Sequence, residues 1–131
     1  QGHGKLSMLY LDIDYFKSVN DKYGHQMGDH ILREFSMVVG SSISATDKLV
    51  RWGGEEFIVF CPETEAGEAQ RKAEKIRLLV SQHLWIHGDS LTCSIGIAEM
   101  KQERVTETIA RADEALYQAK HSGRNQVILS H

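Results

Sequence analysis

Two short acidic segments stand where this chain could perform chemistry. Residues 12–14 read Asp-Ile-Asp at the end of an apolar run, and residues 53–56 read Gly-Gly-Glu-Glu. Side chains alternate along a strand, so the two aspartates lie on one side of it. Two carboxylates brought to about 4 Å repel each other by roughly 4 kcal/mol at an effective dielectric near 20. A divalent cation offsets that repulsion, and an oxygen-only ligand set suits magnesium or manganese rather than zinc.

Magnesium held by two carboxylates and completed by phosphates is typical of sites that polymerise nucleotides. The glycine pair adds to this interpretation, because a bulky ligand can approach a backbone that carries no side chains. Each segment alone has a plainer explanation, as a solvated strand end or as an ordinary hairpin. Together, with the polar stretch 14–28 between them, they favour a functional site.

The elements that must position these acids follow from the apolar pattern. We expect strands over 5–13, 48–52, 56–61, 91–99 and 126–129, and helices over 29–43, 65–84 and 105–121. Residues 14–28 are expected to form a long irregular connection. Gly53 and Gly54 predict a tight hairpin, with positive φ at both. The order β-α-β-β-α-β-α-β predicts an α+β fold that contains the split βαβ arrangement, an antiparallel-containing sheet with helices packed on one face.

Composition limits the classes of function. The 131 residues suffice for one domain, and 41% are hydrophobic and 25% charged, as in soluble globular proteins. A formal net charge of −3 argues against nucleic-acid binding. No apolar run reaches membrane-spanning length and no signal peptide is visible, so we expect a cytoplasmic segment without membrane contact, whose parent protein could be membrane-anchored. Cys61 and Cys93 are expected to be buried free thiols, and the seven histidines show no metal-ligand spacing.

The acidic segments also carry a resemblance to a known family. Residues 51–57, Arg-Trp-Gly-Gly-Glu-Glu-Phe, resemble the signature of GGDEF-type diguanylate cyclases in the variant with glutamate third. Residues 12–25 with Gly28 and Asp29, residues 92–98, and residues 112–120 with 123–125 are similar to three further motifs of that family. Four motifs in the family's order make the resemblance specific.

The resemblance implies a palm-like fold with a ferredoxin-like βαββαβ core and a mixed or antiparallel sheet flanked by helices, related to polymerases and class III nucleotide cyclases. It implies that two GTP-loaded domains face each other and join two GTP into cyclic di-GMP, releasing pyrophosphate. Residues 1–131 form a single such domain, in which the family's Asp-x-Leu-Thr segment and first helix do not precede the first strand. That helix normally covers one face of the sheet, so we expect an exposed apolar patch.

Carried over by position, Asp12, the backbone carbonyl of Ile13 and Glu55 would hold magnesium or manganese. Glu55 would assist deprotonation of the 3′-hydroxyl, which without a cation is far too weak an acid at neutral pH. Glu56 would be a further metal or supporting ligand. The resemblance thus implies three catalytic residues, which are Glu55, Glu56 and Lys17.

Substrate contacts follow from the same resemblance. Asn20 and Asp29 would bind the guanine edge, although a loop asparagine commonly caps a turn and Asp29 stands where a helix N-cap belongs. The phosphate contacts are expected from the backbone near Phe16 and from three cations, Lys17, Lys120 and Arg124. Lys120 and Arg124 also read as ordinary cations at a helix C-terminus, and His25 either contacts the nucleotide or orders its loop.

One departure from the family concerns feedback. Many members carry an inhibitory product-binding motif, Arg-x-x-Asp, that ends five residues before the glycine pair. Here the motif positions are Ser44 and Asp47. A serine hydroxyl cannot supply the forked, charged grip of arginine, so we expect weak or absent inhibition through this site.

Two other functions remain open. A catalytically silent module would bind GTP or cyclic di-GMP and signal through protein contacts, but intact Asp12, Glu55 and Glu56 argue against it. A cyclase for another nucleotide is disfavoured by Asp29, a carboxylate suited to guanine. The expected partners are GTP and a second copy of the domain, brought together by a sensor domain outside this segment.

Overall fold

Strands and helices alternate along the part of the chain, residues 5–131, that the computed structural model describes. In order they are β1 (Leu6–Ile13), α1 (Phe16–Tyr23), α2 (His25–Ser42), β2 (Lys48–Gly53), β3 (Glu56–Pro62), α3 (Ala66–Gln82), β4 (Cys93–Glu99), α4 (Val105–His121) and β5 (Val127–Leu129). Within this part, no helix is long and apolar enough to cross a membrane.

The five strands form one sheet in the order β2-β3-β1-β4-β5. β1 runs antiparallel to both β3 and β4, β2 runs antiparallel to β3, and β5 runs parallel to β4. The first four strands have the order of the split βαβ arrangement. The prediction of an α+β fold with a mixed sheet is therefore confirmed.

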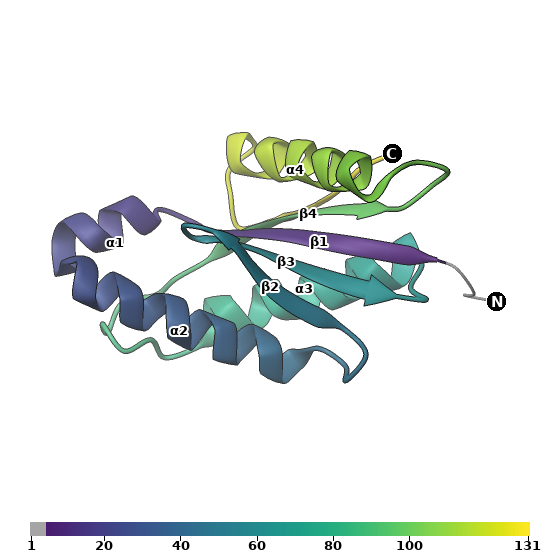
Figure 1. Cartoon of the computed structure of the whole chain (residues 1–131). Coiled ribbons are helices and arrows are strands. Elements are labelled where there is room, and N and C mark those ends of the chain that lie inside the picture. The colour runs from purple at the N-terminus through teal and green to yellow at the C-terminus, as the bar shows by residue number, and fades with distance from the viewer. Residues whose placement is uncertain (1–4) are drawn as a thin grey trace.

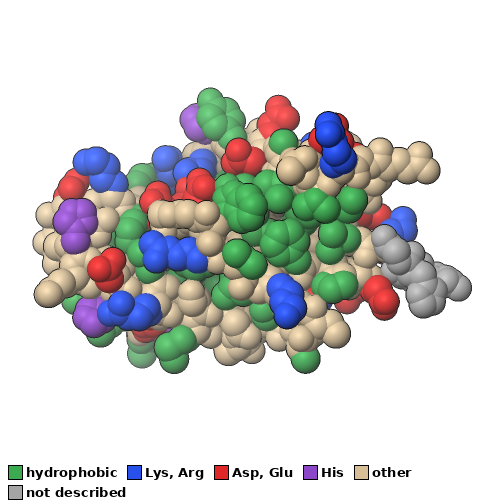
Figure 2. All heavy atoms as spheres, in the orientation of Figure 1, with side chains coloured by type: hydrophobic (Ala, Val, Ile, Leu, Met, Phe, Trp, Pro, Cys, Tyr) green, Lys and Arg blue, Asp and Glu red, His purple; other side chains and the backbone are tan. Residues whose placement is uncertain are grey.

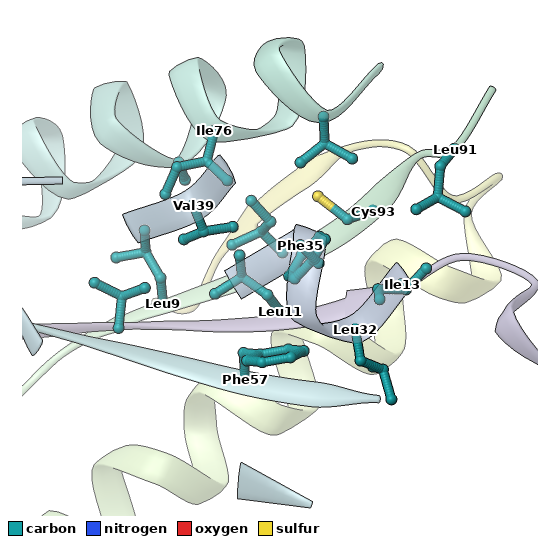
Figure 3. Packing of buried hydrophobic residues seen from close by; sticks show 14 of the residues in the cluster. Leu9, Leu11, Ile13, Leu32, Phe35, Val39, Phe57, Ile76, Leu91 and Cys93 are labelled. Carbon is teal, nitrogen blue, oxygen red and sulfur yellow. The ribbon is translucent and has the colours of Figure 1, made fainter. Parts of the chain in front are cut away.

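Helices cover both faces of the sheet, and the prediction that they pack on one face is wrong (Figure 1). Alternate residues of β1, such as Leu9 and Leu11, belong to a core shared with α2 and α3, where Phe35 and Ile76 lie (Figure 3). The residues that alternate with them, Met8 and Tyr10, pack with α4 instead. A central strand that is buried on both faces has a continuous apolar sequence. Its pattern therefore does not tell whether helices cover one face of the sheet or both.

The polar segment after β1 is helical, and the prediction of an irregular connection over 14–28 is wrong. Its polar residues form the exposed side of α1, while Phe16 and Val19, one helical turn apart, are buried. Gly24, at φ 91°, separates α1 from α2. Because α2 begins at His25, Asp29 lies inside the helix and is not its N-cap.

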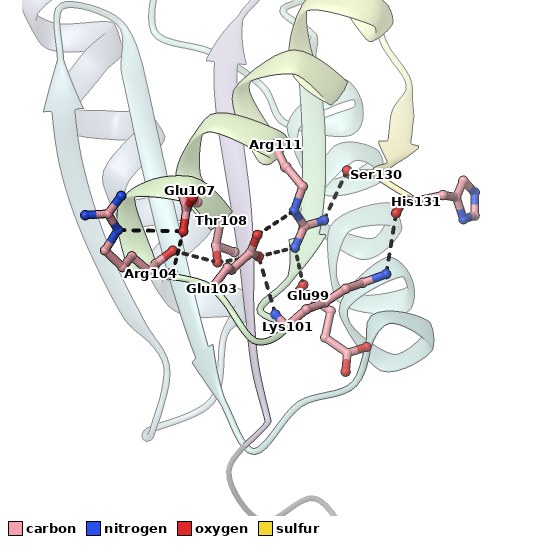
Figure 4. Close-up of polar contacts among 9 residues, drawn as sticks. All are labelled: Glu99, Lys101, Glu103, Arg104, Glu107, Thr108, Arg111, Ser130 and His131. Atoms are coloured by element: carbon pink, nitrogen blue, oxygen red, sulfur yellow. Dashed lines mark hydrogen bonds and ion pairs between the residues drawn. The ribbon is translucent and has the colours of Figure 1, made fainter.

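A network of polar contacts fixes the start of α4 (Figure 4). Arg111 donates to Glu103, to the carbonyl of Glu99 and to Ser130, which ties α4 to the ends of β4 and β5. Thr108 donates to Glu103 at 2.8 Å. The hydrogen bond from Arg111 is the main cause that lowers the pKa of Glu103 to about 2. Because its first turns are held in this way, α4 brings its last turn to the end of β1 that carries Asp12.

Apolar side chains also reach the surface beside α4, over β1, β2 and β3 (Figure 2). Val50 and Trp52 of β2 are exposed, and Leu6 and Phe60 are half-buried. The helix that the family resemblance implies, and its cover over this face, stay predictions. Cys61 and Cys93 are buried and free, as predicted.

Candidate active site

The carboxylate of Asp12 is the most deeply buried acid of the candidate site, with 1% of the residue exposed. In the sheet register it lies opposite Glu56 of β3 and Ser94 of β4. Lys120, from the last turn of α4, forms an ion pair with Oδ2 of Asp12. Oδ1 is buried and has no hydrogen-bond partner among residues 5–131. The two oxygens of this carboxylate thus differ, because Oδ2 is paired with a cation and Oδ1 has no donor.

The charges around Asp12 act on each other strongly. Burial raises the pKa of Asp12 to about 6, with Glu55 and Glu56 adding to the rise and Lys120 opposing it. Burial by itself would lower the pKa of Lys120, but Asp12, Glu55 and Glu56 raise it above its ordinary value. The predicted convergence with the hairpin acids therefore holds for Asp12, and Lys120 supplies a fixed cation that the sequence did not place there.

The hairpin between β2 and β3 carries Glu55 in its turn and Glu56 at the first position of β3. Of the two glycines only Gly54, at φ 50°, is in the left-handed region, so the prediction for Gly53 is wrong. Gly53 instead ends β2 at a β-bulge. Arg51 closes the turn, donating from Nε and Nη2 to the carbonyl of Gly54 at 2.9 and 2.7 Å. This clamp fixes the backbone that presents Glu55.

Asp14 does not join the acid cluster. Its carboxylate accepts hydrogen bonds from the hydroxyls of Thr92 and Ser94, both at 2.7 Å, and from the backbone N–H of Asn125 at 3.0 Å. It therefore holds the end of β1 to β4 and to the loop between α4 and β5, and its oxygens are occupied within the fold.

The turn from β1 into α1 brings Arg124 to the start of that helix. Tyr15 has φ 58° and precedes α1, and the Arg124 guanidinium lies over its ring at 4.6 Å. Nε of Arg124 is buried without a hydrogen-bond partner in the described chain. The side chain of Phe16 is buried, which leaves only its backbone for the expected phosphate contact. Lys17 is exposed and pairs with Asp21 at 3.2 Å, away from the acids.

The expected guanine residues lie on the neighbouring helices α1 and α2. Asn20 packs against Gly28, where a Cβ would come within 1.9 Å of its Oδ1, so only glycine permits this contact. Asp29 is exposed and lines a hollow of about 290 Å³ with Leu32, Arg33, Ser36 and Arg51. His25 is exposed at the first position of α2. Arg51 therefore links this hollow to the hairpin that carries the acids.

Asp47, in the expected inhibitory motif, is committed to the fold. It accepts a hydrogen bond from the backbone N–H of Ser44 at 3.0 Å, and it forms an ion pair with Lys72 of α3 at 2.9 Å. Burial opposes ionisation, but Lys72 and Ser44 outweigh it and lower the pKa of Asp47. Weak feedback through this site stays a prediction, and the geometry supplies a second reason for it beside the missing arginine.

The oxygens near Asp12 suit a divalent cation completed by a substrate. No three His, Cys, Asp or Glu side chains between residues 5 and 131 form a ready-made metal site. The unpartnered Oδ1 of Asp12 and the nearby charges of Glu55 and Glu56 nevertheless provide hard oxygen donors, which magnesium and manganese prefer. The residues present thus fit the expected cation, provided that phosphates complete its ligands.

Known proteins resemble this chain over nearly its whole length. Residues 1–126 match the family described as "Diguanylate cyclase, GGDEF domain". The chain belongs to the GGDEF family. This GGDEF domain is 44% identical over 134 residues to the response regulator PleD of Caulobacter vibrioides, covering 97% of this chain and 30% of PleD. It is 42% identical over 128 residues to the diguanylate cyclase DgcS of Shewanella oneidensis, covering 97% of this chain and 43% of DgcS.

Solved structures show the same fold. The active GGEEF domain of a diguanylate cyclase from Vibrio cholerae superposes with a TM-score of 0.92 at 32% identity, covering 97% of this chain and 83% of that one. The palm-like fold expected from the motifs is therefore confirmed. The GGDEF domain described here spans less than half the length of the two curated relatives.

Two residues of this GGDEF domain contact the site without having been singled out from the sequence. Arg51 belongs to the hairpin motif, and its clamp on Gly54 depends on the bulge, which the sequence does not reveal. Tyr10 donates to Glu56 at 2.9 Å and lies within the apolar strand predicted over residues 5–13. The available signal was its spacing, because residues two apart in a strand share a face and Tyr10 precedes Asp12 by two.

Proposed function

We propose that this GGDEF domain is a diguanylate cyclase that condenses two GTP into cyclic di-GMP and two pyrophosphates, with magnesium or manganese, between two GTP-loaded copies. The observation that carries the proposal is the buried carboxylate of Asp12, which is paired with Lys120 through one oxygen only and lies on β1 directly beside β3, the strand that begins with Glu56. A relative 42% identical to this chain is named a diguanylate cyclase, which supports the same reaction.

Asp12, the backbone carbonyl of Ile13 and Glu55 would hold the metal, with Glu56 as a further ligand. The bound cation supplies charge stabilisation at phosphate and lowers the pKa of a ribose hydroxyl. Glu55, exposed enough on its turn to meet a second molecule, accepts the proton of the 3′-hydroxyl. Lys120, paired with Asp12, keeps the net charge of the cluster low enough for a triphosphate to approach.

The substrate would lie between the acids and α1. Asp29 accepts hydrogen bonds from guanine N1–H and the 2-amino group, while Asn20 serves an acceptor on the base. Arg124, with Nε unpartnered, and the first backbone N–H groups of α1 bind the phosphates. Lys17 is exposed and free to leave Asp21 for a phosphate, since an exposed pair of this kind contributes little.

The chemistry requires two copies of this arrangement. The 3′-hydroxyl of one GTP attacks the α-phosphorus of the other, a phosphodiester bond forms, and pyrophosphate leaves. The same step in the opposite direction closes the ring. One domain holds one GTP, so the second GTP must come from a second domain facing the first.

The test is to incubate the chain with GTP and Mg²⁺ and to identify products by chromatography. We expect cyclic di-GMP from the wild type and a loss of roughly 100-fold or more in the Glu55→Ala variant. Glu68→Gln is the matched control, because Glu68 is exposed on α3, on the opposite face of the sheet from Lys120. Equal product from Glu55→Ala and wild type would refute the role of Glu55.

The same samples distinguish the binding-module alternative. GTP binding by calorimetry that is lost in Asp29→Ala, without any cyclic di-GMP, would show a nucleotide-binding module instead of a cyclase. Product formation that depends on Glu55 excludes that alternative.

A further inference from the structure

Tyr10 is an aromatic residue with its hydroxyl beside the acid cluster. It lies in the middle of β1, 5% exposed, and packs with Met8, Ile58 and Leu116 under α4. Because side chains alternate, Tyr10 and Asp12 lie on the same face of β1. Its ring belongs to the core, and its hydroxyl lies at the polar end of that core.

That hydroxyl meets one acid of the hairpin directly. In the register, Asp12 lies opposite Glu56, and Tyr10 lies opposite Ile58, two residues further along β3. Tyr10 therefore reaches Glu56 along the diagonal, and its hydroxyl donates to Oε1 at 2.9 Å. Because a phenol keeps its proton at neutral pH, the Tyr10 hydroxyl is the donor and the Glu56 carboxylate the acceptor.

The two acids are held in parallel ways. Lys120 engages Oδ2 of Asp12, and Tyr10 engages Oε1 of Glu56. Among the described residues, no hydrogen bond reaches Oδ1 of Asp12, and none is made to Oε2 of Glu56. Each carboxylate thus has one oxygen fixed from the protein side and one oxygen left for a ligand.

We infer that Tyr10 is a positioning residue, which holds Glu56 beside Asp12 against their mutual repulsion so that its second oxygen serves the metal–nucleotide complex. Glu56 stands at the first position of β3, half-buried and with several rotatable bonds, so repulsion from Asp12 would turn its carboxylate outward. The Tyr10 hydroxyl is the donor that keeps it inward. The inference rests on the proposed cyclase function, since it assigns Glu56 a working orientation in that site.

Tyr10→Phe separates positioning from packing, because phenylalanine fills the same space without the hydroxyl. We expect kcat to fall about 10-fold while the KM for GTP stays within about twofold, as for loss of a residue that orients a metal ligand. We also expect a several-fold rise in the Mn²⁺ concentration that gives half-maximal turnover. Tyr117→Phe is the matched control and should change nothing, since Tyr117 is 60% exposed on α4 and its ring stacks on His121.

A double-mutant cycle shows whether the hydroxyl acts through Glu56. Adding Tyr10→Phe to Glu56→Ala should cause no further loss of turnover or of Mn²⁺ response. Unchanged kinetics in Tyr10→Phe, or an equal loss in both backgrounds, would overturn the inference. If the wild type forms no product, the proposed function fails, and calorimetry of Mn²⁺–GTP binding to wild type and Tyr10→Phe then decides the positioning role, with equal affinities counting against it.

Discussion

At the scale of single residues, the buried carboxylate of Asp12 lowers the stability of the folded chain and favours the binding of a cation. A carboxylate with 1% exposure and one unpartnered oxygen is unfavourable in the folded chain unless a cation or a proton joins it. Lys120 compensates in part, but the pKa of Asp12 still rises from 3.8 to about 6. The ionised form is therefore more costly in the folded chain than in the unfolded chain, which is the state of a site prepared for a cation.

Without metal, Asp12→Asn should make the protein more stable near pH 8. The rise in pKa from 3.8 to about 6 corresponds to roughly 3 kcal/mol. The folded chain binds more protons than the unfolded chain between these values, so the stability of the wild type falls as pH rises through the window from about 4 to 6. Asparagine avoids this cost but leaves Lys120 without its partner, so we expect a gain of about 1–2 kcal/mol.

Urea unfolding in EDTA at pH 8 and at pH 4 measures this difference. The gain should be present at pH 8 and largely absent at pH 4, where the wild-type carboxylate is protonated in the folded chain. Asp21→Asn is the control, because Asp21 is exposed and its pair with Lys17 is on the surface. A destabilised Asp12→Asn protein at pH 8 would show that the pair with Lys120 outweighs burial.

At the scale of elements, the sequence predicted most strands and helices because their apolar patterns are regular. The central strand, the hairpin strands, α3 and α4 all lie within a few residues of their expected ranges. The failure at α1 has a physical reason, because an eight-residue helix with only Phe16 and Val19 buried leaves too little apolar pattern to detect. The approach of Asp12 to the hairpin acids was predictable from strand pairing, whereas the position of Lys120 depends on where α4 packs.

The close packing of α4 on β4 depends on Gly96. A Cβ at this position would lie 2.2 Å from the carbonyl oxygen of Ala112 and 2.3 Å from the backbone nitrogen of Leu116. Backbone atoms inside a helix cannot move aside singly, so Gly96→Ala must displace α4 as a whole. We expect a loss of about 3 kcal/mol in the free energy of unfolding, at the upper end for overpacking.

Gly40→Ala provides the control for this prediction, because no atom lies within 4 Å of a Cβ at this helical position in α2. That variant should gain about 0.5–1 kcal/mol from helix propensity. Both are measured by urea unfolding. A Gly96→Ala protein as stable as the wild type would mean that α4 can shift on the sheet at no cost. Because α4 carries Lys120, cyclase activity should fall with the same displacement.

At the scale of the whole molecule, the candidate site lies at the surface of the domain. Glu55 and Glu56 are half-buried on a hairpin turn, and Asp29 and Lys17 are exposed. In the proposed function, such a half-open site binds one GTP without enclosing the α-phosphate of a second GTP. In the proposed reaction, the remaining surface comes from another domain and its own bound nucleotide. Association of two copies then controls turnover.

Turnover per chain should therefore increase with the concentration of this domain. Below the dissociation constant of the dimer, the population of dimers grows with the square of total protein, so doubling the protein should raise the rate about fourfold. The measurement is cyclic di-GMP formation at saturating GTP over roughly a 100-fold range of protein. Added Glu55→Ala chain should lower the rate, because it captures wild-type copies in mixed dimers. The same amount of Asp29→Ala, which is expected to load GTP poorly, should lower the rate as well. A specific activity that stays constant on dilution, and that neither variant depresses, would mean that one copy of the domain completes the reaction alone.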